Sequence, residues 1–169
     1  ILNFARGEIV DEGAVVAALA AGHLASYVCD FPSAALRGNP RVVALPHLGA
    51  STAEAEANCA VMVIDNLREF LENGAIRNSV NFPEAELPTA GTWRITVANA
   101  NVPNMVGQIS SALGDAGLNI ADLLNKSRGD LAYTIVDLDG QVPAVTLERI
   151  RAIDGVLSVR DLGRRPANP

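Results

Sequence analysis

The sequence has little lysine, histidine or cysteine and no long apolar run. Lys126 is the one lysine among 169 residues, and the formal net charge is −6. Because the basic residues form no cluster, the chain lacks the positive surface that attracts nucleic acid or an anionic membrane. Its apolar stretches are interrupted within about a dozen residues, which is too short for a helix that spans a bilayer. We therefore expect neither nucleic acid nor a membrane as a partner.

The two cysteines, Cys29 and Cys59, stand alone in apolar contexts, with no CxxC motif and no metal-ligand spacing. This usage predicts no disulfide framework and no metal site, and it favours a reducing, cytoplasmic setting. With 49% hydrophobic and 19% charged residues, the composition is typical of a folded chain with room for one ordinary domain or two small ones. The chain begins with Ile1 and shows no signal peptide, as though it were cut from a longer sequence.

The first part of the chain alternates short apolar strands with a helix. Three runs are expected to be strands: residues 1–4, 25–31 and 41–45. Between the first two, Asp11 is placed to cap an alanine-rich helix that Gly22 ends. This alternation predicts a parallel sheet in an α/β layer. A longer helix should follow the S-x-x-E capping box of residues 51–54 and end at Asn73 and Gly74.

The second part has the element order βαββαβ. Strands are expected at residues 93–98, 118–124, 131–138 and 156–162, and helices at residues 103–116 and 142–153. This order predicts a ferredoxin-like antiparallel sheet with two helices on one face. Before it, residues 78–82 are expected to be extended. Residues 83–91, which are rich in turn formers and charge, should be an interdomain linker.

Polar side chains end three successive strands of the predicted parallel sheet: Arg6, Asp30 and His47. The carboxyl ends of such strands are where open α/β sheets bind ligands, and a guanidinium there could hold a carboxylate through two hydrogen bonds. Each residue also has a plain structural explanation. Arg6 could pair with a nearby acid, Asp30 could simply end its strand, and His47 could be satisfied by backbone groups. The other histidine, His23, lies at a helix exit, where the helix dipole suits it without any function.

Three segments, ILNFARGEIVDEGAVVAAL, HLASYVCDF and LPHLGASTAEAEAN, resemble the carboxyl-proximal half of the nucleotide-binding domain of D-2-hydroxyacid dehydrogenases. The form HLGAST-x-EAE, followed by a helix and NSVNFPE, is most similar to the phosphoglycerate dehydrogenases of that family. Residues 92–163 resemble the ACT domain that many of these enzymes carry at the C-terminus. The implied architecture is α/β: a partial Rossmann-like parallel sheet layer followed by a βαββαβ ferredoxin-like (ACT) domain.

The resemblance implies roles for individual positions. His47 matches the catalytic histidine, which acts as general base toward the 2-hydroxyl of the substrate while a hydride passes to NAD⁺. Arg6 matches the arginine that holds the substrate carboxylate. The residues that match segments lining the nicotinamide side of NAD are Phe4, Ala5, Arg6, Asp30, His47, Leu48, Gly49 and Ala50. The implied substrate is 3-phosphoglycerate, which is oxidised to 3-phosphohydroxypyruvate in serine biosynthesis.

The chain departs from this family pattern in two ways. The family normally places a glutamate five residues after the aspartate, where it pairs with the histidine, whereas this chain has Ala34 or Ala35 there. Without a carboxylate, His47 would lose its orientation and charge partner, so we expect a slow enzyme or one that uses another acid. The sequence also contains no GxGxxG phosphate loop. This piece alone should therefore not turn over.

In enzymes of this type the ACT domain pairs with a second copy, and serine binds at the junction as a feedback inhibitor. By resemblance, Asn101 and Asn119 align with effector-binding asparagines, and Asn99 stands where a histidine is often found. Asn104 stands in place of the usual loop glycine. Alternatively, these asparagines only form turns. The resemblance implies a homo-oligomer through this domain.

These observations predict five segments. They are residues 1–51, the C-terminal half of an NAD-binding domain; 52–82, a connecting helix and return segment of the substrate domain; 83–91, the linker; 92–163, the ACT-like regulatory domain; and 164–169, a tail. The predicted function is that of the C-terminal portion of an NAD-dependent D-2-hydroxyacid dehydrogenase acting on 3-phosphoglycerate. The alternatives are a dehydrogenase of another D-2-hydroxy acid and a non-catalytic module that binds an amino acid or mediates oligomerisation.

Overall fold

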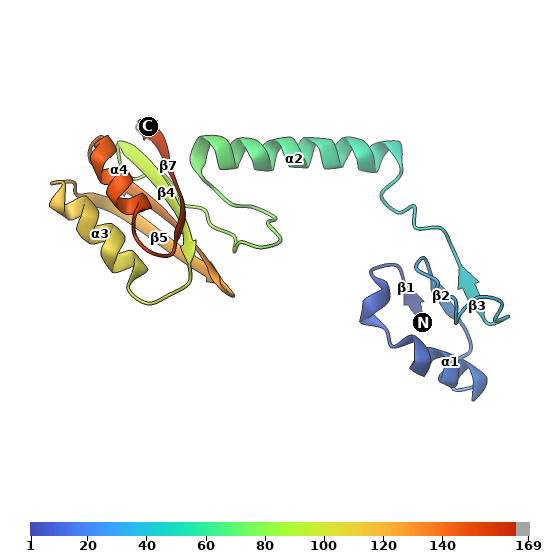
Figure 1. Ribbon diagram of the computed structural model, residues 1–169. Helices are drawn as coiled ribbons and strands as arrows, with labels where there is room; N and C mark the ends of the chain where they lie inside the picture. Colours follow the sequence, from blue (N-terminus) through green and yellow to red (C-terminus); the bar gives the residue numbers. More distant parts are fainter. Residues whose placement is uncertain (165–169) are drawn as a thin grey trace. The chain divides into compact units, whose positions relative to one another are not determined.

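The computed structural model describes residues 1–164, so the expected tail lies, after Arg164, outside the described residues. The chain divides into two compact units, Ile1–Asn58 and Cys59–Pro169, each with its own sheet (Figure 1). The division falls inside a long helix, whereas the sequence suggested a linker at residues 83–91.

The N-terminal unit contains a three-stranded parallel sheet, as predicted. Its strands β1 (Leu2–Asn3), β2 (Tyr27–Cys29) and β3 (Val42–Ala44) pair in that order. The short 3-10 turn η1 (Gly7–Ile9) and the helix α1 (Glu12–Ala20) connect β1 to β2. Because all three strands are parallel, the loops that follow them emerge at the same edge of the sheet.

The helix α1 is fixed by a cap and by apolar packing. The Asp11 carboxylate accepts a hydrogen bond from the backbone N–H of Ala14 at 3.0 Å, which confirms the predicted N-cap. Gly22 has a φ of 76°, the left-handed conformation expected just beyond a helix end. The buried side chains of this unit form one cluster: Val15, Leu19, Tyr27, Cys29 and Leu36.

The helix α2 (Ala53–Asn73) begins one residue later than the predicted capping box requires. The hydroxyl of Thr52, rather than that of Ser51, accepts from the backbone N–H of Ala55 at 3.1 Å. Glu54 is therefore the second helical residue, not the third that a capping box needs, and the box does not form. Among the described helices, none combines the length and apolar character needed to cross a membrane.

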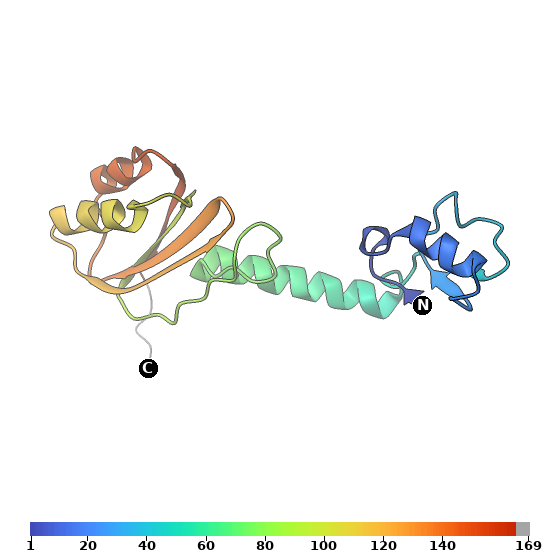
Figure 2. The same cartoon turned by 90° about the horizontal axis from the view of Figure 1, so that it is seen from below.

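The C-terminal unit has the predicted βαββαβ order. Its antiparallel strands are β4 (Trp93–Ala100), β5 (Ile120–Arg128), β6 (Leu131–Leu138) and β7 (Val156–Arg164), in the spatial order β5-β6-β4-β7. The helices α3 (Met105–Asp115) and α4 (Ala144–Arg151) lie together on one side of this sheet (Figure 2). This is the ferredoxin-like arrangement.

The core of this unit lies between the sheet and the two helices. Alternate residues of β4 and β6 face the helices, as the period of a strand requires. The buried cluster consists of Ile95, Val97, Ile109, Ala112, Leu113, Val136, Leu138, Val142, Leu147, Ile150 and Val159.

The opposite face of the sheet is covered as well. Ile76 and Ala85 form an antiparallel bridge, and both pack with Tyr133 and Ile135 of β6. Residues 78–82, expected to be extended, instead form bends, with Asn78 at a φ of 54°. In residues 83–91, expected to be an interdomain linker, Ala85 is buried and packs with Leu87 against the sheet.

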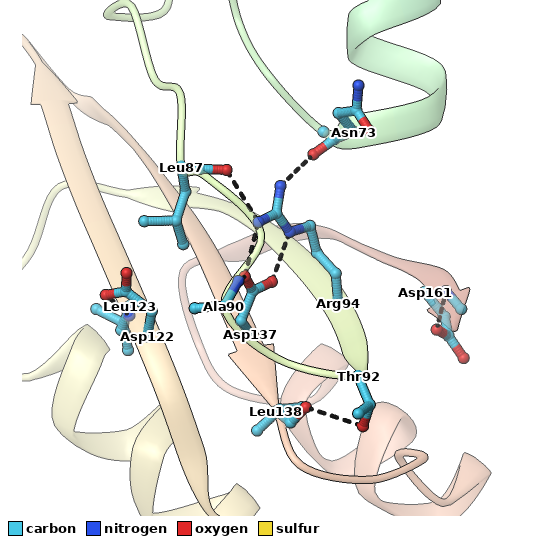
Figure 3. A network of polar contacts seen from close by, with 12 residues as sticks. Asn73, Leu87, Ala90, Thr92, Arg94, Asp122, Leu123, Asp137, Leu138 and Asp161 are labelled. Atoms are coloured by element: carbon cyan, nitrogen blue, oxygen red, sulfur yellow. Dashed lines mark hydrogen bonds and ion pairs between the residues drawn. The ribbon is translucent and has the colours of Figure 1, made fainter. Parts of the chain in front are cut away.

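A buried ion pair strengthens this second layer (Figure 3). Arg94 and Asp137 are directly opposite each other on β4 and β6, and their side chains are 2% and 0% exposed. The guanidinium donates to both carboxylate oxygens, at 2.6 and 2.7 Å. It also donates to the carbonyl oxygens of Asn73, at the end of α2, and of Leu87. One side chain therefore fixes three segments that are distant in the sequence.

Candidate functional site

The site lies at the carboxyl edge of the parallel sheet, and its first element is the loop after β1. Asn3 is buried, and its side-chain oxygen accepts from the backbone N–H of Ala5 at 3.1 Å, while its amide donates to the carbonyl of Arg6 at 2.9 Å. The same amide contacts the Tyr27 hydroxyl at 3.3 Å. Asn3 thus shapes the turn that presents Arg6. Sequence reasoning missed Asn3, although a polar residue inside an apolar strand was a usable signal.

The second element joins the ends of β2 and β3. Nδ1 of His47 lies 2.7 Å from Oδ2 of Asp30. The two residues come together because Cys29 pairs with Ala44 in the parallel ladder, so that the loops after both strands start side by side. The Asp30 side chain is only 6% exposed, whereas the His47 side chain is 44% exposed. The carboxylate is therefore fixed inside, and the imidazole is reachable from solvent.

Phe31 completes the surroundings of the imidazole. Its ring centroid is 4.2 Å from that of His47, with a tilt of 39° between the planes. The guanidinium carbon of Arg6 lies 5.9 Å from the Phe31 centroid. Arg6 is exposed, and its Nη1 donates to the Ala5 carbonyl, which leaves most of its donors for a ligand. Phe31 was not among the residues predicted for the site.

The expectation that His47 has no carboxylate partner is wrong. Ala34 and Ala35, which occupy the positions where the glutamate was sought, are exposed residues of the turn after β2. The carboxylate comes instead from Asp30, which was predicted only to face the cofactor. The sequence hid this pairing because the two residues are 17 positions apart and meet only through the strand register.

The remaining predicted residues lie in the loops at the same edge. Phe4 and Ala5 follow β1, and Leu48, Gly49 and Ala50 follow His47; all five are exposed. The described contacts do not tie them to the Asp30–His47 pair. Their placement at the edge is as expected, and their contact with a cofactor stays a prediction.

Two of the three candidate effector residues lie around one small cavity in the C-terminal unit. A hollow of about 140 Å³ is lined by Asn99, Asn101, Asn104 and Asn125, together with apolar side chains. Asn99 is fully buried, and its Oδ1 has no hydrogen-bond partner among the described residues. Asn119 does not line this cavity; its backbone N–H donates to Asp139.

One known family model matches the first part of the chain. Residues 1–49 match the family described as D-isomer specific 2-hydroxyacid dehydrogenase, NAD binding domain. The edge that carries Arg6, Asp30 and His47 lies within this matched segment.

Curated dehydrogenases are similar to nearly the whole chain. D-3-phosphoglycerate dehydrogenase of Escherichia coli (strain K12) is 31% identical over 173 residues, which cover 95% of this chain and 42% of that enzyme. The Haemophilus influenzae enzyme is 32% identical, with 96% and 42% coverage, and the Dictyostelium discoideum enzyme is 30% identical with the same coverage. The chain thus spans less than half the length of these dehydrogenases.

Solved structures are similar to about half of the chain at a lower level. The ACT domain from GTP pyrophosphokinase of Chlorobium tepidum has a TM-score of 0.38 and 14% identity, covering 43% of this chain and 99% of that one. GqqA, a quorum quenching acylase, has a TM-score of 0.39 and 22% identity, covering 52% and 49%. The ferredoxin-like assignment rests on the strand order and the two helices observed here.

Proposed function

We propose that this chain is the C-terminal portion of an NAD-dependent D-3-phosphoglycerate dehydrogenase, which oxidises 3-phosphoglycerate to 3-phosphohydroxypyruvate in serine biosynthesis. The observation that carries the proposal is the accessible imidazole of His47, held against a buried carboxylate at the ligand-binding edge of an NAD-binding domain. The identity of about a third to curated D-3-phosphoglycerate dehydrogenases supports the choice of substrate.

The residues present suit the nicotinamide side of the cofactor. Oδ1 of Asp30 is buried and has no hydrogen-bond partner among the described residues, so it can accept from an amide donor. Phe4 and Leu48, both exposed apolar side chains at the same edge, offer surface for a flat ring. NAD⁺, when bound, supplies the acceptor for the hydride that leaves C2 of the substrate. The chain offers no GxGxxG loop for the pyrophosphate.

The side chains of this unit divide the remaining work. The guanidinium of Arg6 holds the substrate carboxylate through two parallel hydrogen bonds and so orients C2. The free Nε2 of His47 accepts the proton of the 2-hydroxyl as the carbonyl forms, and returns it in the reverse direction. The Asp30 carboxylate accepts from Nδ1–H and offsets the positive charge that develops on the ring.

The test is activity of the full-length enzyme with 3-phosphoglycerate and NAD⁺. His47→Ala should lower kcat by about 10²–10⁴-fold, the usual contribution of a positioned general base. His23→Ala is the matched control and should leave kcat unchanged, because His23 lies in the turn after α1, away from the strand ends. Full activity of the His47→Ala variant would exclude the catalytic assignment.

Substrate choice and completeness are tested in the same assay. A dehydrogenase of another D-2-hydroxy acid would show higher kcat/KM with that acid than with 3-phosphoglycerate. The chain by itself should show no turnover, since half of the cofactor site is absent from its sequence. Turnover by the isolated chain would contradict this part of the proposal. The free state of both cysteines supports a cytoplasmic enzyme.

The C-terminal unit is proposed to act as an ACT-type regulatory domain that binds L-serine and joins copies of the chain. The cavity has a volume of about 140 Å³, whereas pockets for drug-sized ligands begin at roughly 300 Å³. Its size therefore suits a ligand as small as an amino acid. The unpaired Oδ1 of Asn99 can accept a hydrogen bond from the ammonium group of the bound amino acid. Asn101 contributes an amide beside it, and Asn119 would come from a second copy. The edge strands β5 and β7 are available for pairing between copies.

Calorimetry of this chain with L-serine tests the regulatory proposal. Binding should release heat and raise Tm, and Asn101→Ala should weaken it, while D-serine serves as the matched control ligand. No heat and no stabilisation at millimolar L-serine would reject serine as the effector. Binding of serine by a full-length enzyme without dehydrogenase activity would favour the non-catalytic alternative.

A further inference from the structure

We propose that Asp30 is the positioning residue of His47, and that it takes the role for which the resembled family uses a glutamate absent from this chain. The catalytic consequence rests on the proposed function. The contact itself is a property of the chain and can be tested without any turnover.

The first argument is the burial of the carboxylate. With its side chain 6% exposed, Asp30 has given up most of its hydration, and an ionised carboxylate in that state needs a partner. The described structure gives its Oδ2 one hydrogen bond, to Nδ1 of His47 at 2.7 Å, and gives Oδ1 none. The imidazole therefore provides the compensation that keeps this aspartate inside, and the bond should be short and persistent.

The second argument is the absence of a described competitor for Nδ1. Ala34 and Ala35 carry no polar side chain. Glu8 and Glu12 line a hollow together with Arg6 and Phe31, and neither makes a described contact with His47. Asp30 is the carboxylate that the fold brings to the ring.

The third argument is that the ring is held on two sides. The Asp30 carboxylate fixes Nδ1, and the Phe31 ring covers the imidazole at a centroid distance of 4.2 Å. Because Phe31 is the residue after Asp30, one short turn provides both contacts. The imidazole can then rotate little, and its other nitrogen keeps a fixed direction.

The chemical consequence is a defined tautomer. A carboxylate can only accept, so the neutral ring carries its proton on Nδ1 and leaves the lone pair of Nε2 free. When Nε2 takes the hydroxyl proton, both nitrogens are protonated and the ring becomes a cation beside the carboxylate. The bonded proton between Nδ1 and Oδ2 need not leave the ring. This is the arrangement that a general base requires.

The tautomer can be read directly by nitrogen-15 NMR of this chain at a pH at which the nitrogen-15 shifts show both imidazole rings to be neutral. His47 should show the Nδ1–H form as the main species, whereas the exposed His23 should show the mixture of a free histidine. Asp30→Asn should move His47 toward the Nε2–H form, since an amide can donate to Nδ1. A wild-type His47 with the same tautomer ratio as His23 would overturn the proposal, whatever the behaviour of the variant.

The second arm uses the full-length enzyme with 3-phosphoglycerate and NAD⁺. Asp30→Asn should lower kcat by about 10²–10⁴-fold. Because kcat is measured at saturating substrate and NAD⁺, a weaker binding of NAD⁺ by the variant would raise KM and would not account for this loss. Ala34→Glu in the otherwise unaltered enzyme should change kcat by about twofold or less, because Nδ1 is already engaged. A gain in kcat of about tenfold or more from Ala34→Glu would show that no residue of the unaltered enzyme performs the role of the glutamate, and would refute the role of Asp30.

The two arms separate the two proposals. A fixed Nδ1–H tautomer without dehydrogenase activity would retain the Asp30 inference and reject the proposed function. Dehydrogenase activity that changes by less than about twofold in Asp30→Asn would retain the proposed function and reject the Asp30 inference.

Discussion

Replacing Asp137 with alanine should destabilise the C-terminal unit by about 3–5 kcal/mol. The substitution removes the partner of a guanidinium that is 2% exposed, and it deletes two charge-assisted hydrogen bonds, at 2.6 and 2.7 Å. Each such bond contributes about 1.5–3 kcal/mol, which agrees with the estimate for breaking a buried pair. The backbone N–H of Ala90 also loses its acceptor, Oδ2 of Asp137.

Urea unfolding followed by the fluorescence of Trp93 is the suitable assay. Trp93 is the one tryptophan of the chain and is adjacent to Arg94, so it reports on this unit rather than on the N-terminal one. With a urea slope of about 2 kcal/mol/M, a loss of about 4 kcal/mol lowers the midpoint by about 2 M. Hydrogen exchange should also rise in residues 87–90, which the pair holds to the sheet.

The matched control is the double variant Arg94→Met/Asp137→Leu. Apolar side chains of similar size avoid leaving a lone buried charge, so the double variant should recover most of the loss. A single variant that loses less than about 1 kcal/mol, or a double variant no better than the single, would show that the charge is not what holds this layer.

Two further predictions concern the segment that ends α2. Tyr133→Phe should cost about 0.5–1.5 kcal/mol at neutral pH, because the hydroxyl donates to the Gly74 carbonyl at 2.9 Å. Burial raises the pKa of Tyr133 above 10.0, so the stabilisation by its hydroxyl is complete below pH 10.0 and is lost as pH rises through the raised pKa. Urea unfolding of the wild type and of Tyr133→Phe at pH 7 and above pH 10 should show that the difference in their free energies of unfolding becomes smaller at the higher pH. Gly74→Ala should be more destabilising than Gly117→Ala by about 1 kcal/mol or more in thermal unfolding. Both glycines have positive φ, but only a Cβ at 74 would meet Thr96, at 2.5 Å, and Leu162, at 2.9 Å; equal losses would contradict this.

Local patterns were sufficient for the elements of the fold. The cap at Asp11 depends on residues within one turn, and the alternation in residues 131–138 depends on the period of a strand. Where two neighbouring residues could cap equally well, as at Ser51 and Thr52, sequence could not decide between them. At residues 83–91 the polar and turn-forming composition did not indicate that distant side chains hold the backbone, as Asp137 holds Ala90 and Arg94 holds Leu87.

For the site, the sequence by itself determined which polar residues end the parallel strands, because strand and turn signals are local. Only the tertiary structure decided that Asp30 holds His47, across 17 positions, and that Asp137 holds Arg94, across 43. Both pairings follow from the register between neighbouring strands, Cys29 with Ala44 and Arg94 with Asp137. Register is fixed by the packing of whole sheets, because a shift of one residue would move every side chain of a strand to the opposite face. No short segment of the sequence contains that information.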